Sequence, residues 1–211
     1  MPILQSIQVG AIQSYPQADG EPWKTAYYKS PVAGAVHLGT LTLDGDDQQH
    51  KKVHGGVHRA SLGYSAEHYA LWREELGMEL PYGAFAENFT ISGLDEDSVC
   101  LGDIYQIGET VRVQVSQPRR PCNQINQRWG RPDLQKRVGE SLRTGWYMRT
   151  LQEGLVEAGM SLRLLERPYP QWTIRAVHGI YDGMKRDPHS AHTLAQCEAL
   201  EPSWREKLAK A

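Results

Sequence analysis

The sequence predicts a mainly β domain with some α-helix, followed by a small appendage of three helices. Two observations support this fold class. Residues 1–167 contain short runs of alternating apolar and polar residues, separated by Gly, Asp and Asn, a pattern typical of strands joined by turns. Residues 173–211 instead carry apolar residues at helical spacing. A chain of 211 residues has room for both parts, so we expect a β domain over 1–167 and a three-helix domain over 173–211.

The alternation in polarity places the expected strands. Residues 3–9 form a plausible first strand, and residues 38–43 form another that ends at an acidic turn. The strongest β signal covers residues 99–116, in which valines alternate with polar residues up to Ser116. A last strand is expected over residues 161–165.

Two helices are expected inside the β domain. Residues 65–76 carry an apolar stripe, with Ser65 suited to cap the N-terminus and Gly77 suited to end the helix. A shorter helix is expected over residues 133–138.

The appendage follows a linker at residues 167–170, in which two prolines favour an extended chain. The last helix is expected to begin with a capping box formed by Ser203 and Glu206. The apolar residues of the whole appendage are expected to pack against the β domain or a second subunit. The helices are expected over residues 173–184, 190–200 and 203–211.

Composition excludes several classes of protein. The net charge is −2, which predicts no general attraction to nucleic acid or to an anionic membrane. Three cysteines, an odd number, suit a reducing compartment, and no leader or membrane-spanning stretch is apparent, so we expect a cytoplasmic chain.

Residues 116–150 stand out because they carry 8 Lys and Arg against 2 Asp and Glu. Arginine suits phosphate and carboxylate ligands, although a solvated basic face would have the same composition.

Residues 50–59 contain histidines at every fourth position, His50, His54 and His58. On a continuous helix this spacing would align three zinc ligands, but the pair Gly55-Gly56 makes such a helix improbable. The glycines could instead let backbone N–H groups approach an anion. A tight hairpin with a solvated basic rim is the simpler alternative. The basic side chains around such an anion would be Lys51, Lys52, His54 and Arg59.

A cysteine lies just after the strongest strand. Pro118 and Pro121 cannot donate sheet hydrogen bonds, so the strand should end and a rigid loop at a sheet edge should begin. Cations beside a thiol favour the thiolate, which attacks electrophiles and binds soft metals, and Cys122 has two neighbouring arginines. Cys100 and Cys197 are expected to be core residues. Amides on the same loop, those of Asn123 and Asn126, could reach a heterocycle or could simply form turns.

Five short motifs occur in order along residues 52–154. They are Lys52-Val53-His54-Gly55-Gly56 with Arg59-Ala60, Glu87-Asn88-Phe89-Thr90, Leu101-Gly102-Asp103, Val115 to Cys122, and Thr144-Gly145-Trp146-Tyr147 with Arg149 and Gly154. Taken together, these motifs resemble the MOSC domain, the C-terminal domain of molybdenum cofactor sulfurases, and in particular its YiiM-like branch, which has a C-terminal three-helix domain. The departure from the family pattern is Ala86, where Gly usually precedes Glu87-Asn88.

The resemblance implies a β-barrel-like domain that binds a pterin molybdenum cofactor. It implies Cys122 as the catalytic thiolate and protein ligand of the metal. The residues implied to bind the cofactor are Lys52, His54, Gly55, Gly56, Arg59, Asn88, Ser116, Arg119 and Asn123. Asn88 and its neighbour Glu87 could instead serve turn structure. All of these residues precede the linker, so cofactor binding is expected to survive removal of residues 168–211.

The resemblance also implies an activity, the reduction of N-hydroxylated compounds such as hydroxylaminopurines. The sequence has no dinucleotide fingerprint and no cysteine-rich iron–sulfur motif, so a separate flavin or iron–sulfur reductase is expected to supply electrons. A second hypothesis is a sulfur carrier with a persulfide on Cys122. A third is a ligand-binding regulator whose three helices form a helix-turn-helix, against which the balance of 8 basic and 8 acidic residues over 151–211 argues.

Overall fold

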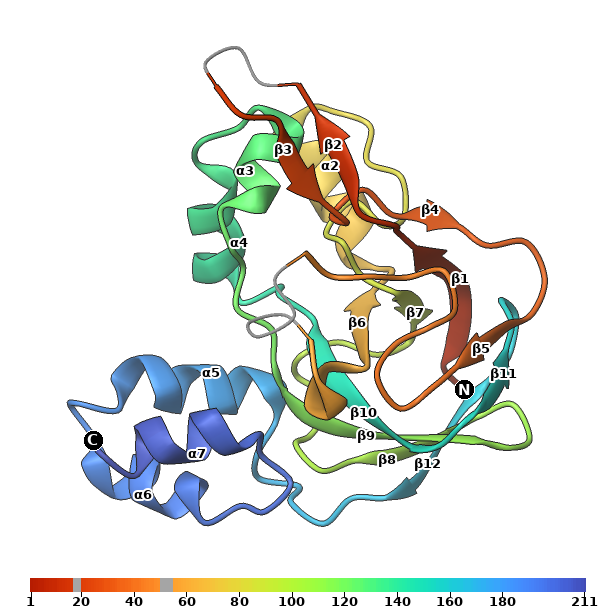
Figure 1. Ribbon diagram of the computed structural model, residues 1–211. Helices are drawn as coiled ribbons and strands as arrows, with labels where there is room; N and C mark the ends of the chain where they lie inside the picture. Colours follow the sequence, from red (N-terminus) through yellow and green to blue (C-terminus); the bar gives the residue numbers. More distant parts are fainter. Residues whose placement is uncertain (17–19, 50–54) are drawn as a thin grey trace.

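The computed structural model describes residues 1–16, 20–49 and 55–211, and its centre is a curled mixed sheet that forms a half-barrel (Figure 1). The eight strands follow the order β12-β8-β9-β10-β6-β7-β1-β4. Neighbours are antiparallel except for β6 and β7, which are parallel. The strands are β1 (Ile3–Val9), β4 (Ser30–Pro31), β6 (Ser61–Ser65), β7 (Phe89–Ser92), β8 (Ile104–Ile107), β9 (Val111–Pro118), β10 (Trp146–Gln152) and β12 (Leu162–Glu166).

The curvature of the sheet brings its first and last parts together. An antiparallel bridge joins Ile3 of β1 to Ser161, and the Leu162 N–H donates to the Pro2 carbonyl at 2.9 Å. Two small antiparallel pairs complete the β structure. These are β2 (Gln13–Tyr15) with β3 (Trp23–Thr25), and β5 (Val36–Leu38) with β11 (Gly154–Val156).

Alternating apolar residues fill the concave side of the sheet. Val111, Val113 and Val115 of β9 are fully buried, while Arg112 between the first two is exposed. This confirms the alternation predicted from the sequence. Alternate side chains of a strand point to the same face of the sheet, so the core forms on the inner face. Among the described residues, every helix is too short or too polar to cross a membrane.

A second core lies where three helices cover one end of the half-barrel. They surround an aromatic cluster that includes Tyr64 and Phe85, whose rings stack with centroids 4.6 Å apart. Gly77 ends the first of these helices in a left-handed conformation, as expected. The helices are α2 (His68–Leu76), α3 (Gln124–Trp129) and α4 (Leu134–Ser141), and a short 3₁₀ turn, η1 (Val57–Arg59), precedes β6.

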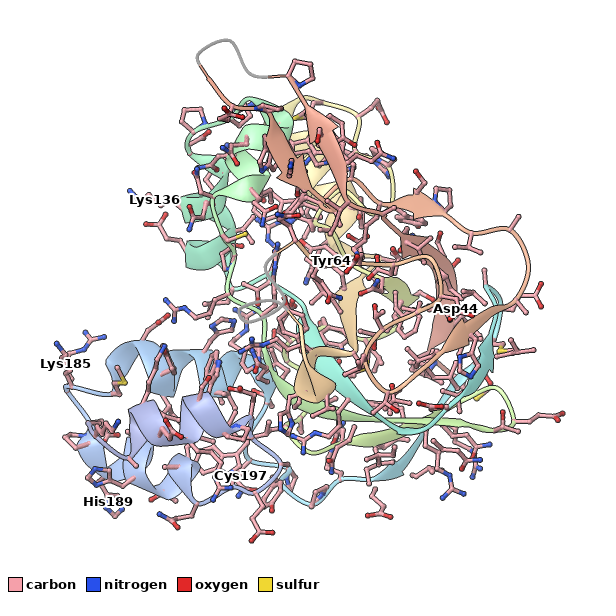
Figure 2. The ribbon with its side chains drawn as sticks, viewed as in Figure 1. Asp44, Tyr64, Lys136, Lys185, His189 and Cys197 are labelled. Carbon is pink, nitrogen blue, oxygen red and sulfur yellow. The ribbon has the colours of Figure 1, made fainter. Side chains whose placement is uncertain are left out.

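The C-terminal helices form a compact group beside β8 and β9, drawn in blue in Figure 1. Leu101, which precedes β8, is buried in the same apolar cluster as Val177 and Leu194, so the tail packs directly on the sheet domain. In Figure 2, Lys185 and His189 extend from the far side of this group, and both are exposed. The helices are α5 (Ile174–Gly183), α6 (Pro188–Ala195) and α7 (Pro202–Leu208).

The structure corrects several expectations about single elements. Residues 38–43 are not a strand, because the Gly39 N–H donates to the Thr42 carbonyl and closes a turn. Ser65 belongs to β6 and does not cap α2. The capping box is absent, since the Trp204 N–H donates to the Glu201 carboxylate instead. The loop after β9 leaves an interior strand of the sheet and not an edge.

Candidate functional site

A pocket opens where the end of β9 meets the second core. Its empty volume is about 630 Å³, part of it continuous with solvent, which is within the range of small-molecule sites. It lies between the β9–α3 loop, the start of β10 and the segment after β3. The lining residues are Thr25, Ala26, Tyr27, Lys29, Asp47, Gln48, Gln49, Arg59, Leu62, Ala86, Asn88, Arg119, Arg120, Cys122, Gln124 and Tyr147.

Cys122 lines this pocket from the loop between β9 and α3. The strand stops at Pro118, as expected from the missing N–H of proline. The Cys122 carbonyl accepts from the Ile125 N–H at 3.3 Å, so the loop turns directly into α3. The Cys122 thiol is half-buried, whereas Cys100 and Cys197 are 2% and 4% exposed, which confirms that these two are core residues.

Arg119 is the most deeply buried cation of the pocket, with 3% of its surface exposed. Its Nη2 donates to the Tyr27 hydroxyl and to the Phe85 carbonyl, each at 3.1 Å. Among the described residues, its buried Nη1 has no hydrogen-bond partner. Burial disfavours the cation, but the neighbouring side chains of Tyr27, Tyr147 and Cys122 raise the pKa of Arg119, so it stays charged. A buried cationic donor without a partner fits an anionic ligand.

Two tyrosines border the same space, the buried Tyr27 and the half-buried Tyr147. Burial raises the pKa of Tyr27 to about 12, although the nearby Arg119 opposes the shift. Burial likewise raises the pKa of Tyr147, against Arg119 and Arg59. Both phenols therefore remain neutral and can serve as hydrogen-bond partners.

Lys29 and Asp46 form a buried ion pair at the pocket wall, with side-chain exposures of 7% and 0%. The Asp46 carboxylate also accepts from the Asn88 amide at 2.9 Å and from the Gly10 N–H at 2.9 Å. Burial lowers the pKa of Lys29, while Asp46 raises it. Three lining residues, Tyr27, Lys29 and Tyr147, were not predicted from the sequence. Tyr147 lies inside a motif already noted, but the segment around Tyr27 gave no signal.

Of the residues expected to bind a cofactor, Arg59, Asn88 and Arg119 line the pocket together with Cys122. Asn88 also fixes the start of β6, because its Oδ1 accepts from the Leu62 N–H at 3.1 Å. The guanidinium of Arg59 lies 6.0 Å from the centre of the Tyr147 ring.

Four other expected residues do not line the pocket within the described part of the chain. Ser116 is buried, and its hydroxyl lies 2.6 Å from the His58 carbonyl and 3.0 Å from that of Tyr147, so it supports the turn that carries Arg59. Asn123 accepts from the Asn126 amide at 2.9 Å at the start of α3. The remaining two are Gly55 and Gly56, which precede η1.

The segment from His50 to His58 was also considered as a zinc site. Lys52 and His54, like His50, lie outside the described residues. Within the described ranges, no group of three His, Cys, Asp or Glu side chains could hold a metal ion. Burial and the nearby Arg149 lower the pKa of His58.

Ala86, at the pocket wall, adopts a left-handed backbone conformation with φ of 61°. Glycine favours this conformation because it lacks a Cβ atom. The turn before Glu87-Asn88 is therefore present, but here an alanine occupies the strained position.

Comparisons with known proteins agree with this architecture. A family model described as the MOSC domain matches residues 50–163. Protein YiiM of Escherichia coli is 35% identical over 207 residues, 97% of this chain and 90% of that protein. A Gibberella moniliformis protein named "Reductase" is 34% identical over 201 residues, 94% of this chain but 35% of its own. The crystal structure of YiiM from Geobacillus stearothermophilus has a TM-score of 0.83 and 35% identity, covering 100% of this chain and 98% of that one.

Proposed function

Since this chain belongs to the MOSC domain family, which is associated with binding of the molybdenum cofactor, we propose that it is an oxidoreductase that uses this cofactor to reduce N-hydroxylated compounds. The reductase name of the Gibberella moniliformis relative supports an oxidoreductase-type role. The observation that carries the proposal is that the Cys122 thiol lines the same pocket as Arg119, whose buried Nη1 has no hydrogen-bond partner among the described residues.

The residues present fit such a cofactor. A thiolate is a soft ligand and suits molybdenum, so Cys122 would hold the metal. The cofactor's phosphate needs cationic donors, and Arg119, Arg59 and Lys29 line the same space. Asn88 holds Asp46, which in turn fixes Lys29 at the wall. The neutral hydroxyl of Tyr27 keeps Arg119 pointing into the pocket.

A molybdenum cofactor held by Cys122 and the pocket's cations would supply the two-electron redox chemistry needed to cleave the N–O bond. The overall change breaks that bond, consumes two electrons and two protons, and yields an amine and water. The pocket's own residues bind and orient the reactants.

The two electrons come from a separate reductase in this proposal. The chain has 3 cysteines, two of which are in the core, so it cannot supply the four thiolates of an iron–sulfur cluster. A flavin or iron–sulfur protein is the chemical class of partner required.

The test is a cysteine series assayed with cofactor-loaded protein and a supplied electron donor. We expect Cys122→Ser to abolish reduction of an N-hydroxylated purine, because serine has similar volume but cannot provide a soft anionic ligand at neutral pH. Cys100→Ser and Cys197→Ser should mainly lower stability. Product amine is measured directly, and circular dichroism checks the fold of each variant. Turnover and molybdenum content equal to the parent in Cys122→Ser would overturn the proposal.

A second arm tests the anion-binding role of Arg119. Hydrogen bonds to charged groups contribute ~1.5–3 kcal/mol, so Arg119→Gln should weaken cofactor retention about tenfold or more. Lys185→Gln is the matched control, because Lys185 is exposed on the tail. Molybdenum and pterin are measured in native protein. Near-equal amounts support the proposal, whereas sulfane sulfur without metal would favour a sulfur carrier, and the absence of all three would favour a binding module.

A further inference from the structure

We propose that the C-terminal helices are part of the pocket's framework and that His178 of α5 is a positioning residue for the Cys122 loop. The inference concerns the same pocket as the proposed function and deepens it. It rests, however, on contacts of this chain alone, and its test does not require a bound cofactor.

His178 joins α5 to the segment that leads into β10, beside the Cys122 loop. The side chain is 3% exposed, and its Nε2 lies 2.9 Å from the Thr144 hydroxyl oxygen at the start of β10. The backbone of Arg119, just after β9, lies close enough to the ring to act on the pKa of His178, which it raises. The Arg119 N–H donates to the Gly145 carbonyl at 3.0 Å. The imidazole of the tail therefore lies against the place where the end of β9 is joined to the start of β10, from which the pocket is built.

A second contact lies one residue closer to the thiol. Arg120 Nη1 lies 2.6 Å from Asp182 Oδ1, and the guanidinium lies 4.9 Å from the centre of the Tyr181 ring. Both Asp182 and Tyr181 follow His178 on α5. The ion pair is about half exposed and contributes little stability alone. It nevertheless holds the Cys122 loop toward α5, the helix that carries His178.

A third contact reaches the opposite side of the pocket. Just before α7, the Glu201 N–H donates to the Ser116 carbonyl at 3.1 Å, and its carboxylate lies 3.7 Å from Arg59 Nη2. The tail thus contacts both the Cys122 loop and a lining arginine. In Figure 1, α5 lies directly beside the chain that leaves β9. These contacts argue against the expectation that cofactor binding survives removal of residues 168–211, which cofactor retention in the shortened chain would test.

The test measures the rate at which iodoacetamide modifies Cys122 in the full-length chain, with mass spectrometry identifying the modified peptide. Cys100 and Cys197 are buried, so they report unfolding. We expect His178→Ala to raise the Cys122 rate about fivefold, the change in population that corresponds to the loss of a hydrogen bond of ~1 kcal/mol. His178→Gln, which can donate and accept, should restore a rate near the parent's.

Two further variants separate positioning from general destabilisation. Val177→Ala removes a buried contact on the same helix and should lower the melting temperature without changing the Cys122 rate. Asp182→Asn, at an exposed position that tolerates substitution, should raise the rate about twofold, and Glu206→Gln should leave it unchanged.

Two results would overturn the inference. One is a parent-like rate in folded His178→Ala and in Asp182→Asn. The other is an equal increase in Val177→Ala, which would indicate loosening of the whole tail. Metal and pterin are measured on the same preparations. If the cofactor is missing but the variants show the expected rates of Cys122 modification, only the proposed function fails. If the cofactor is bound but the variants modify Cys122 at the parent's rate, only this inference fails.

Discussion

At the scale of single residues, Ala86 carries strain that a one-atom change can release. Its φ of 61° costs an L-residue ~1 kcal/mol or more, a cost that glycine does not have. Glycine also gains freedom in the unfolded chain, which offsets part of the benefit. We therefore expect Ala86→Gly to raise the free energy of unfolding by up to about 1 kcal/mol, measured by urea denaturation.

The matched control is Ala84→Gly on the same loop. Ala84 is buried and is not among the residues with positive φ, so its replacement should lower stability by about 1 kcal/mol. Equal effects of the two substitutions would show that the backbone conformation at Ala86 carries no cost.

A second residue-scale effect concerns pH. Burial lowers the pKa of His178 from its usual 6.5 to about 4, with Asp182 and Glu96 opposing the shift and Arg120 assisting it. The unfolded chain therefore binds a proton between these pH values that the folded protein does not. The associated stability is present above pH 6.5 and is lost as pH falls toward 4.

We expect this difference to cost the parent about 2 kcal/mol between pH 7 and pH 5, measured by guanidinium denaturation at both values. His178→Gln lacks the titrating group, so its loss over the same interval should be smaller by that amount. Identical losses in the two proteins would contradict a neutral buried imidazole.

At the scale of elements, the β6–β10 contact depends on glycine. A Cβ atom on Gly145, which has φ of 79°, would lie 2.3 Å from the Gly63 carbonyl oxygen. At Gly130, which has φ of 60°, no atom of the described residues lies within 4 Å of such a Cβ. Gly130→Ala should therefore cost only the ~1–2 kcal/mol of left-handed strain, whereas Gly145→Ala should cost at least about 2 kcal/mol more, by overpacking. Urea denaturation of both variants measures the difference, and similar losses would refute the close approach.

The same scale shows which elements sequence could predict. The first strand has the expected bounds because its β-branched residues Ile3, Ile7 and Val9 favour a strand, although the pairing with β7 shifts register between Leu4 and Ser6. Helix α3 was not predicted, because its six residues have only one fully buried side chain, that of Ile125, and no apolar stripe. Residues 38–43 alternate in polarity, but Gly39 allows a turn that tertiary packing selects. The secondary structure of such short segments depends on the residues that pack against them in space, and these contacts cannot be identified from a single sequence.

The pocket also contains residues that the sequence could predict and residues that it could not. Cys122, Arg119, Arg59 and Asn88 could be predicted because they stand in recognisable motifs, and they line one pocket. Lys29 could not, because its role depends on an ion pair with Asp46, 17 positions away. The involvement of α5 was equally hidden, since a lone histidine on a helix gives no sign of the loop that it will contact.

At the scale of the whole molecule, the tail and the sheet domain share a core and a hydrogen-bond network. Ile174 of α5 belongs to the apolar cluster of the sheet, and Leu101 belongs to that of the tail. The Ile174 N–H donates to the Val99 carbonyl at 2.9 Å, and the Leu101 N–H to the Trp172 carbonyl at 2.8 Å. Neither part can unfold without exposing apolar surface of the other.

We therefore expect one cooperative unfolding transition for the full chain, with calorimetric and van't Hoff enthalpies in agreement. Leu208→Ala, at a fully buried position near the C-terminus, should cost ~2–5 kcal/mol and shift that single transition as a unit. Lys185→Ala, at an exposed position of the tail, should leave it in place. Scanning calorimetry decides the matter. If Leu208→Ala produced a separate low-temperature peak while the main peak stayed fixed, the tail would be an independent unit. Its contacts with Thr144 and Arg120 could then not hold the Cys122 loop at the temperatures between the two peaks.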